Sequence, residues 1–192
     1  MVLLRHAETA WTVLGRHTGR TDIALTEQGR EAARALRSEL ERLPVVRVLC
    51  SPLRRARETA ALLGWPDPEL SDDLVEWDYG DLEGLTRTEV LASRPSWDLW
   101  RDGGPGGEAP AEMTTRADRV VALLRAGPPG TTVVVGHGHM LRSLAVRWIA
   151  QPLPLGAHLP LDPGGRAVLG FDRGVPVVRH WNAPHKIPPQ GV

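Results

Sequence analysis

The chain has 192 residues, of which 42% are hydrophobic and 24% are charged, and its formal net charge is zero. These values are ordinary for one globular domain with a sizeable core. The balanced charge argues against nucleic-acid and membrane-surface partners. No apolar run approaches the ~20 residues of a membrane-spanning helix, and a single cysteine excludes an internal disulfide. We therefore expect a cytoplasmic protein without a secretory signal.

The first third of the chain predicts two buried strands, each followed by a helix. A short apolar run at residues 2–4 suits a strand and leads directly into Arg5 and His6. Thr26 has the pattern of a helix N-cap, and Pro44 ends the helical spacing that follows it. The predicted segments are a strand over 2–4, a helix over 27–43, a strand over 45–49, and a helix that opens at Ser51-Pro52 and reaches about Gly64.

The rest of the chain continues the alternation. Its predicted segments are helices over 86–93, 111–126 and 140–150, and strands over 131–135, 166–171 and 175–181. Residues 95–110 are rich in Gly and Pro and predict a long, lid-like loop. We expect a single domain over 1–187 and a flexible tail over 188–192.

Alternating strands and helices predict an α/β fold with a largely parallel sheet. In such sheets, ligands bind beyond the carboxyl ends of the strands, where helix N-termini point free N–H groups. The segments that follow the predicted strands include Arg5-His6, residues 51–57, and His137-Gly138-His139. We expect all three segments to meet at one edge of the sheet.

The residues at that edge suit a phosphoryl group. Arg5 and one further arginine can clamp an anion bidentately, and His137 adds a donor; the candidates for the second arginine are Arg54, Arg55 and Arg57. His6 can act as the nucleophile, because a neutral imidazole is available near pH 7.

A leaving alkoxide needs a proton, so an acid should stand nearby. The chain offers Glu76, in the partly apolar stretch LVEWDYGDLEG. A partly apolar setting raises a carboxyl pKa toward the working range. The alternative donors in the same stretch are Asp78, Asp81 and Glu83.

Other chemistries fit less well. His137 and His139 have no further Cys or His cluster to complete a metal site, and neither a P-loop motif nor a GxSxG elbow is present. Cysteine phosphatases place Arg six positions after the nucleophilic Cys, and that position after Cys50 is Ala56. We expect no metal and no cofactor.

Four motifs together resemble the histidine phosphatase superfamily, also called phosphoglycerate mutase-like. They are LLRHAET, SPLRRARETA, the Glu76 stretch and VVVGHGH, and they span roughly residues 2–145 in the order typical of the family. The resemblance implies a three-layer α/β/α sandwich with a mostly parallel sheet. Ala7 replaces the glycine that the family signature usually has at this position.

The resemblance also implies roles for individual residues. It makes His6 the phosphorylated nucleophile and Glu76 the proton donor. It selects Arg55 and places it with Arg5 and His137 in the phosphate pocket. The further substrate-binding candidates are Thr9, Thr18, Gly19, Trp77, Tyr79, Gly138 and His139.

Within the superfamily, GRHTGRTDIALT and EWDYGDLEGLT resemble the branch of bacterial acid phosphatases and sedoheptulose-1,7-bisphosphatase-like enzymes. We therefore expect a phosphomonoesterase acting on small phosphorylated metabolites, with sugar phosphates or bisphosphates favoured. The alternatives are a phosphoglycerate mutase-type isomerase and a non-catalytic phosphate-binding module. The cofactor-dependent mutases of this superfamily have longer chains with a basic insert, and this chain has no such insert between Ala92 and Glu112. Dimers are common in this superfamily, so a homodimer is expected by analogy.

Overall fold

A computed structural model describes residues 1–183 of the chain, so the predicted tail over 188–192 and the end of the predicted domain lie outside the described residues. The core of the structure is a six-stranded sheet with the order β3-β2-β4-β1-β5-β6. The strands are β1 (Val2–Arg5), β2 (Val45–Cys50), β3 (Glu69–Leu70), β4 (Thr131–Gly136), β5 (Arg166–Asp172) and β6 (Val175–Ala183). Strands β3, β2, β4 and β1 pair in parallel, whereas β5 and β6 pair antiparallel. The prediction of a mostly parallel α/β sheet is confirmed.

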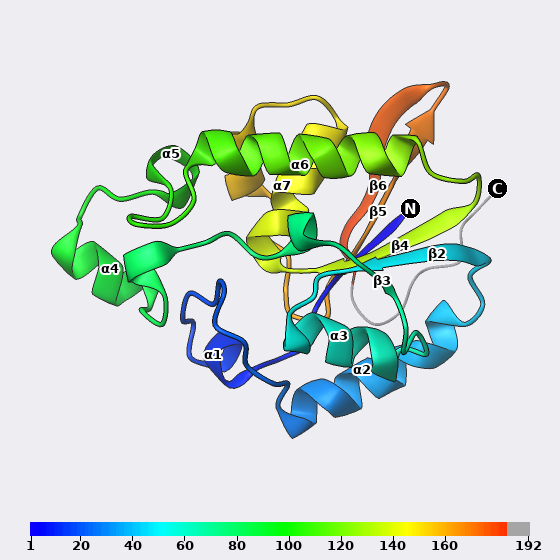
Figure 1. Ribbon diagram of the computed structural model, residues 1–192, viewed down its shortest axis with the longest axis horizontal. Helices are drawn as coiled ribbons and strands as arrows, with labels where there is room; N and C mark the ends of the chain where they lie inside the picture. The colour runs from blue at the N-terminus through cyan, green and yellow to red at the C-terminus, as the bar shows by residue number, and fades with distance from the viewer. Residues whose placement is uncertain (184–192) are drawn as a thin grey trace.

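Helices cover both faces of the sheet, which gives three layers (Figure 1). The helices are α1 (Ala10–Val13), α2 (Glu27–Leu40), α3 (Arg54–Leu62), α4 (Arg87–Ser93), α5 (Leu99–Asp102), α6 (Pro110–Arg125) and α7 (Gly138–Trp148). Short 3-10 turns lie at Asp72–Leu74, Gly80–Leu82 and Leu153–His158. Helices α2 and α3 pack on one face of the sheet, and α6 and α7 pack on the other.

The alternation of side chains along β1 divides the core between the two faces. Leu3 belongs to the apolar cluster under α6 and α7, whereas Leu4 belongs to the cluster under α2 and α3. Strand β4 is buried from Thr132 to Gly136, because both of its faces are covered. The apolar run of β1 is therefore fixed on both sides, and the residue after it is delivered to the sheet edge in one orientation.

Several predicted boundaries are confirmed. Thr26 caps α2 by accepting a hydrogen bond from the Gly29 amide at 3.0 Å, and Thr86 caps α4 together with Glu89. The predicted cap of α3 is wrong, since that helix begins at Arg54 after Leu53 and has no side-chain cap. The hydroxyl of Ser51 instead contacts a histidine, as described below.

The predicted long loop over 95–110 contains α5 and is packed against the rest of the domain. Trp97 and Trp100 are each only 6% exposed and belong to the core cluster that includes Trp77. Gly104 and Gly107 lie against the backbone of the Tyr79 region so closely that a Cβ on either would approach backbone atoms within 3 Å. The two tryptophans therefore pack on the core.

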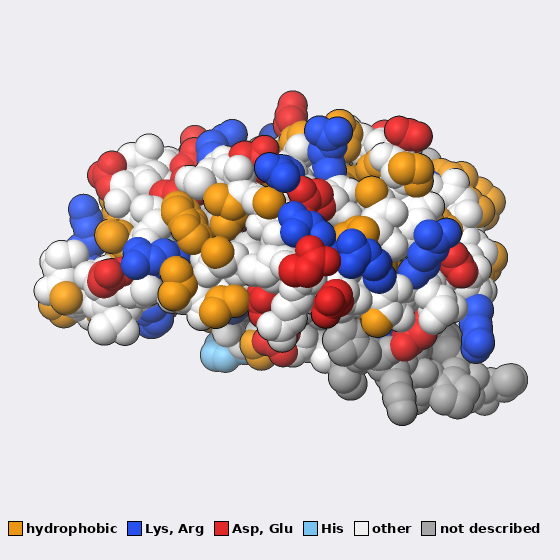
Figure 2. Space-filling view, turned by 90° about the horizontal axis from the view of Figure 1, so that it is seen from below, with side chains coloured by type: hydrophobic (Ala, Val, Ile, Leu, Met, Phe, Trp, Pro, Cys, Tyr) orange, Lys and Arg blue, Asp and Glu red, His pale blue; other side chains and the backbone are white. Residues whose placement is uncertain are grey.

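The surface carries intermixed charges. On the face that Figure 2 shows, which is the underside of the view in Figure 1, acidic and basic side chains lie intermixed. On α2 and α3, Glu58 pairs with Arg30 at 3.5 Å and with Arg54 at 2.7 Å. Among residues 1–183, no helix is both long enough and apolar enough to span a membrane.

Candidate active site

Strand β1 ends at a buried histidine. The amide of His6 donates to the Gly136 carbonyl at 2.9 Å, which continues the β1–β4 pairing by one residue, and the side chain is only 3% exposed. Its Nδ1 lies 2.8 Å from the Ala7 carbonyl oxygen. Since a carbonyl only accepts, Nδ1 carries the proton and Nε2 keeps its lone pair. Burial, followed by the charges of Arg5 and Arg55, lowers the pKa of His6 well below 6.5, so the ring is neutral at pH 7.

Arg5 presents unsatisfied donors beside this histidine. Its Nη1 donates to the Leu161 carbonyl, whereas its Nε is buried and has no hydrogen-bond partner within the described chain. Its guanidinium packs against Gly138, where an added Cβ would lie 3.3 Å from Arg5 Cζ. Burial lowers the pKa of Arg5 from its ordinary value. A buried guanidinium with an unused N–H is a ready partner for an anion.

Arg55 is the second cation of the site. It is fully buried, whereas Arg54 and Arg57 are exposed. Its Nη2 donates to the carbonyls of Thr18 and Gly19 at 3.0 and 2.8 Å. Burial lowers its pKa. Among the three arginines that the spacing leaves open, only Arg55 points into the domain.

His137 is held between Arg55 and Ser51. Its Nδ1 accepts from Arg55 Nε at 3.1 Å, and its Nε2 lies 2.7 Å from Ser51 Oγ. Because the guanidinium can only donate, the Nε2 atom carries the proton and donates to Ser51. Burial and the nearby Arg55 charge lower the pKa of His137 well below 6.5, in agreement with a neutral ring. The rings of His6 and His137 lie 5.1 Å apart between centroids.

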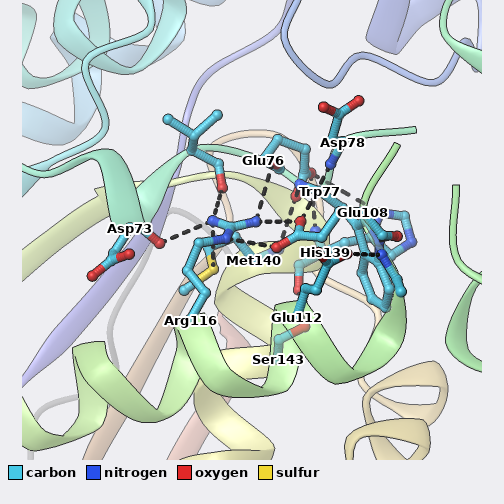
Figure 3. A network of polar contacts seen from close by, with 12 residues as sticks. Asp73, Glu76, Trp77, Asp78, Glu108, Glu112, Arg116, His139, Met140 and Ser143 are labelled. Atoms are coloured by element: carbon cyan, nitrogen blue, oxygen red, sulfur yellow. Dashed lines mark hydrogen bonds and ion pairs between the residues drawn. The ribbon is translucent and has the colours of Figure 1, made fainter. Parts of the chain in front are cut away.

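Glu76 approaches the same edge from the segment between two 3-10 turns and is 5% exposed. Its Oε1 accepts from the amides of Trp77 and Met140 at 2.9 and 2.8 Å, and its Oε2 accepts from the His139 amide at 3.0 Å (Figure 3). The side chain therefore lies on the N-terminus of α7. Three backbone N–H groups thus bind the carboxyl group, which the sequence pattern does not predict.

The alternative acids of the same stretch have other partners or face solvent. Asp78 pairs with Arg20 at 2.8 Å, and Glu83 accepts from the Thr21 amide at 2.7 Å. Asp81 is exposed. Of the acids in this stretch, Glu76 has the side chain that reaches the N-terminus of α7 beside Arg5.

The further substrate-binding candidates fall into two groups: those that contact site residues and those whose contacts are structural. Thr18 and Gly19 bind Arg55 through their carbonyls, and Gly138 leaves room for Arg5. The Tyr79 hydroxyl and His139 Nδ1 lie 2.6 Å apart. Two candidates instead have structural contacts: Thr9 caps α1, and the fully buried Trp77 donates its indole N–H to the Glu108 carbonyl.

Ala7 stands next to the nucleophile candidate without crowding it. Its amide donates to Thr59 Oγ1 at 3.0 Å, and its side chain belongs to a small apolar cluster with Leu25 and Ala33. The methyl group that distinguishes alanine from glycine thus packs into the domain.

Sequence reasoning missed three residues of this region. Ser51 has the local pattern of a helix cap, and its contact with His137 spans 86 positions. Arg116 and Glu108 form a partly buried ion pair behind Glu76, at 2.6 Å. The sequence offers no clear signal for the pair, since Glu108 lies in the Gly- and Pro-rich stretch before α6 and Arg116 lies two turns into that helix.

The assembled site can bind a tetrahedral anion and attack it. The guanidinium groups of the half-buried Arg5 and the buried Arg55 lie near the acidic side chain of Glu76, so the site favours a doubly negative phosphate ester. The ends of β1, β2 and β4 bring His6, Arg55 and His137 together as expected from the topology. Within residues 1–183, no three His, Cys, Asp or Glu side chains form a group that could hold a metal ion.

The whole chain is similar to known proteins. An acid phosphatase of Mycobacterium tuberculosis is 43% identical over 179 residues, which cover 91% of this chain and 88% of the relative. A sedoheptulose 1,7-bisphosphatase of Saccharomyces cerevisiae is 31% identical over 77% of this chain and 66% of its own. A solved structure of an open-reading-frame product of M. tuberculosis has a TM-score of 0.92 and 39% identity, covering 96% and 97% of the two chains.

The family model of the histidine phosphatase superfamily (branch 1) matches residues 1–184, which is nearly the whole chain. The match includes each strand end that carries a site residue. The chain therefore belongs to the histidine phosphatase superfamily.

Proposed function

We propose that this protein hydrolyses phosphate monoesters of small molecules through a phosphohistidine on His6. The observation that carries the proposal is the hydrogen bond of the His6 ring: Nδ1 lies 2.8 Å from the Ala7 carbonyl oxygen, so Nδ1 holds the proton and Nε2 carries the lone pair. Burial lowers the pKa of the ring, which favours its neutral form. A neutral imidazole beside the guanidinium groups of Arg5 and Arg55 is suited to nucleophilic attack on phosphorus. The acid phosphatase and bisphosphatase relatives support the same chemistry.

In the first step, Arg5 and Arg55 hold the phosphoryl oxygens. Of the five N–H donors of a guanidinium, four in Arg55 bind His137, Thr21, Thr18 and Gly19, which leaves one Nη1–H with no acceptor among residues 1–183. His6 Nε2 attacks phosphorus and forms the N–P bond. The P–O ester bond breaks, its electron pair stays on the leaving oxygen, and Glu76 in its acid form gives that oxygen a proton.

The second step returns the enzyme to its starting state. Glu76, now a carboxylate, takes a proton from a water molecule that attacks the phosphohistidine. The N–P bond breaks, its electron pair returns to Nε2, and inorganic phosphate leaves. His137 would stabilise the charge of the transferred group once its Nε2–H turns from Ser51 to a phosphoryl oxygen.

We propose sugar phosphates or bisphosphates as the substrate class, because a sedoheptulose 1,7-bisphosphatase is among the relatives. The test is phosphate release from a panel of metabolite phosphates by the purified protein, with His6→Ala as the control. We expect turnover of several sugar phosphates and none by the variant. Hydrolysis unchanged in His6→Ala would refute the proposal.

A second assay, on 3-phosphoglycerate, separates hydrolysis from isomerisation. Conversion of 3-phosphoglycerate to 2-phosphoglycerate, stimulated by the bisphosphate, would identify a mutase instead. A cytoplasmic location and a homodimer stay predictions from the sequence, which cell fractionation and sedimentation would test.

A further inference from the structure

A partly buried ion pair lies behind the segment that carries Glu76 (Figure 3). Arg116, on α6, and Glu108, just before it, have side chains only 12% and 13% exposed. Arg116 Nε binds Glu108 Oε1 at 2.8 Å, and Nη2 binds Oε2 at 2.6 Å. This two-point contact fixes the plane of the guanidinium, which an ammonium group cannot do.

The remaining donors of Arg116 bind the backbone that leads to Glu76. Its Nη1 donates to the Asp73 carbonyl at 2.9 Å and to the Val75 carbonyl, and its Nη2 reaches the Glu76 carbonyl at 3.4 Å. Residues 75–79 are in neither a helix nor a strand. Their buried backbone groups therefore need partners from elsewhere, and Arg116 supplies them.

Glu108 holds the other side of the same segment. Its carbonyl accepts from the Trp77 indole N–H at 2.8 Å, and its amide donates to the Asp78 carbonyl at 2.9 Å. Its carboxylate Oε2 also accepts from the Asp78 amide at 3.4 Å. Arg116 and Glu108 thus form hydrogen bonds with the chain immediately before and after Glu76.

We propose that the Arg116–Glu108 pair is the positioning device of the acid: it sets the backbone so that the Glu76 carboxyl group meets the amides of His139 and Met140. The inference rests on the proposed function of Glu76. The proposed role is one of positioning, through the backbone around Glu76, and not one of contact with the substrate. A buried ion pair alone is weak evidence for stability, but every contact above is spent on the residues around Glu76.

The test uses two esters that differ in their need for an acid. p-Nitrophenyl phosphate has a good leaving group, whereas glycerol 2-phosphate releases an alkoxide that must be protonated. The quantity compared is kcat/KM, which reports formation of the phosphoenzyme. A fall in the amount of folded protein lowers kcat/KM for both esters by the same factor, so their ratio responds only to a change in the site.

The variants are Arg116→Lys and Glu108→Gln, with Glu76→Gln as the reference. Loss of the acid should lower kcat/KM for glycerol 2-phosphate by about 100-fold and change the aryl ester only a few-fold. We expect Arg116→Lys and Glu108→Gln each to lower kcat/KM for glycerol 2-phosphate by about 10-fold and to keep kcat/KM for p-nitrophenyl phosphate within about 3-fold of wild type. Arg119→Lys is the matched control, since Arg119 lies one turn away on α6 and pairs with the Asp73 carboxylate at the surface; it should leave both esters unchanged.

Should a single variant fail to fold, the double variant Arg116→Met/Glu108→Leu removes both charges together and leaves no lone buried ion. It should show the same loss confined to the alkyl ester. Equal loss on both esters, or no loss on either, in variants that fold would overturn the positioning role. If Glu76→Gln itself affected both esters equally, the acid role of Glu76 would fail first, and the inference with it.

Discussion

Deleting the Ser51 hydroxyl tests whether His137 donates a hydrogen bond to the bound phosphoryl group. The fully buried His137 donates its Nε2–H to Ser51 Oγ at 2.7 Å in the free protein. In Ser51→Ala that N–H loses its acceptor, which costs about 1–3 kcal/mol. For a chain of 192 residues, each kcal/mol lowers Tm by roughly 2–4 °C.

A bound anion changes this cost. If a phosphoryl oxygen takes over the Nε2–H, the hydroxyl is no longer needed in the complex, and the variant regains part of its lost stability. Calorimetry without ligand and with saturating phosphate or vanadate should therefore show a Tm gap between wild type and Ser51→Ala that narrows with the anion. The Leu53 amide also donates to Ser51 Oγ, at 3.3 Å, and that loss is the same in both states.

The matched control is Ser143→Ala. Ser143 is equally buried, but its hydroxyl donates to the His139 carbonyl at 2.8 Å, within α7. Its Tm loss should be the same with and without the anion. A gap for Ser51→Ala that stays constant on adding phosphate would refute the assignment of His137 as a phosphate ligand.

Three further predictions concern groups around the site. In the folded protein the pKa values of His6 and His137 lie well below 6.5, so below pH 6.5 these two histidines take up protons only when the chain unfolds. The free energy of unfolding should therefore fall by roughly 1.4 kcal/mol per pH unit for each histidine. A free energy of unfolding that stays constant from pH 7.5 to 5.5 in guanidinium titrations would contradict this. Gly138→Ala places a methyl 3.3 Å from Arg5 Cζ and should raise KM for p-nitrophenyl phosphate about 10-fold with little change in Tm; an unchanged KM would remove Arg5 from substrate binding. Burial raises the pKa of Cys50 to about 12, so iodoacetamide at pH 8 should leave the native protein unmodified and label it only after unfolding, as mass spectrometry would show.

The parts of the site that the sequence predicts are those at strand ends. A short apolar run followed by Arg5-His6, and a β-branched run followed by Gly136-His137, place their polar residues by local pattern alone. Parallel topology then brings them to one edge. The motif resemblance added the choice of Arg55, which burial in the structure supports.

What the sequence could not predict depends on distant contacts. Ser51 has the pattern of a cap, but the competing partner His137 is 86 residues away. Trp97 and Trp100 stand in a Gly- and Pro-rich segment, and α5 has only four residues, too few for a hydrophobic period. The Arg116–Glu108 pair acts on an irregular segment, whose backbone partners follow from no local rule.

In the proposed mechanism, the phosphoryl group passes through His6. The test is to let the enzyme turn over an aryl phosphate labelled in its phosphoryl group, quench the reaction, and locate the label on the protein by mass spectrometry. We expect one phosphoryl group on His6, labile in acid and stable in base, and none in His6→Ala. A label on another residue, or an acid-stable one, would contradict it.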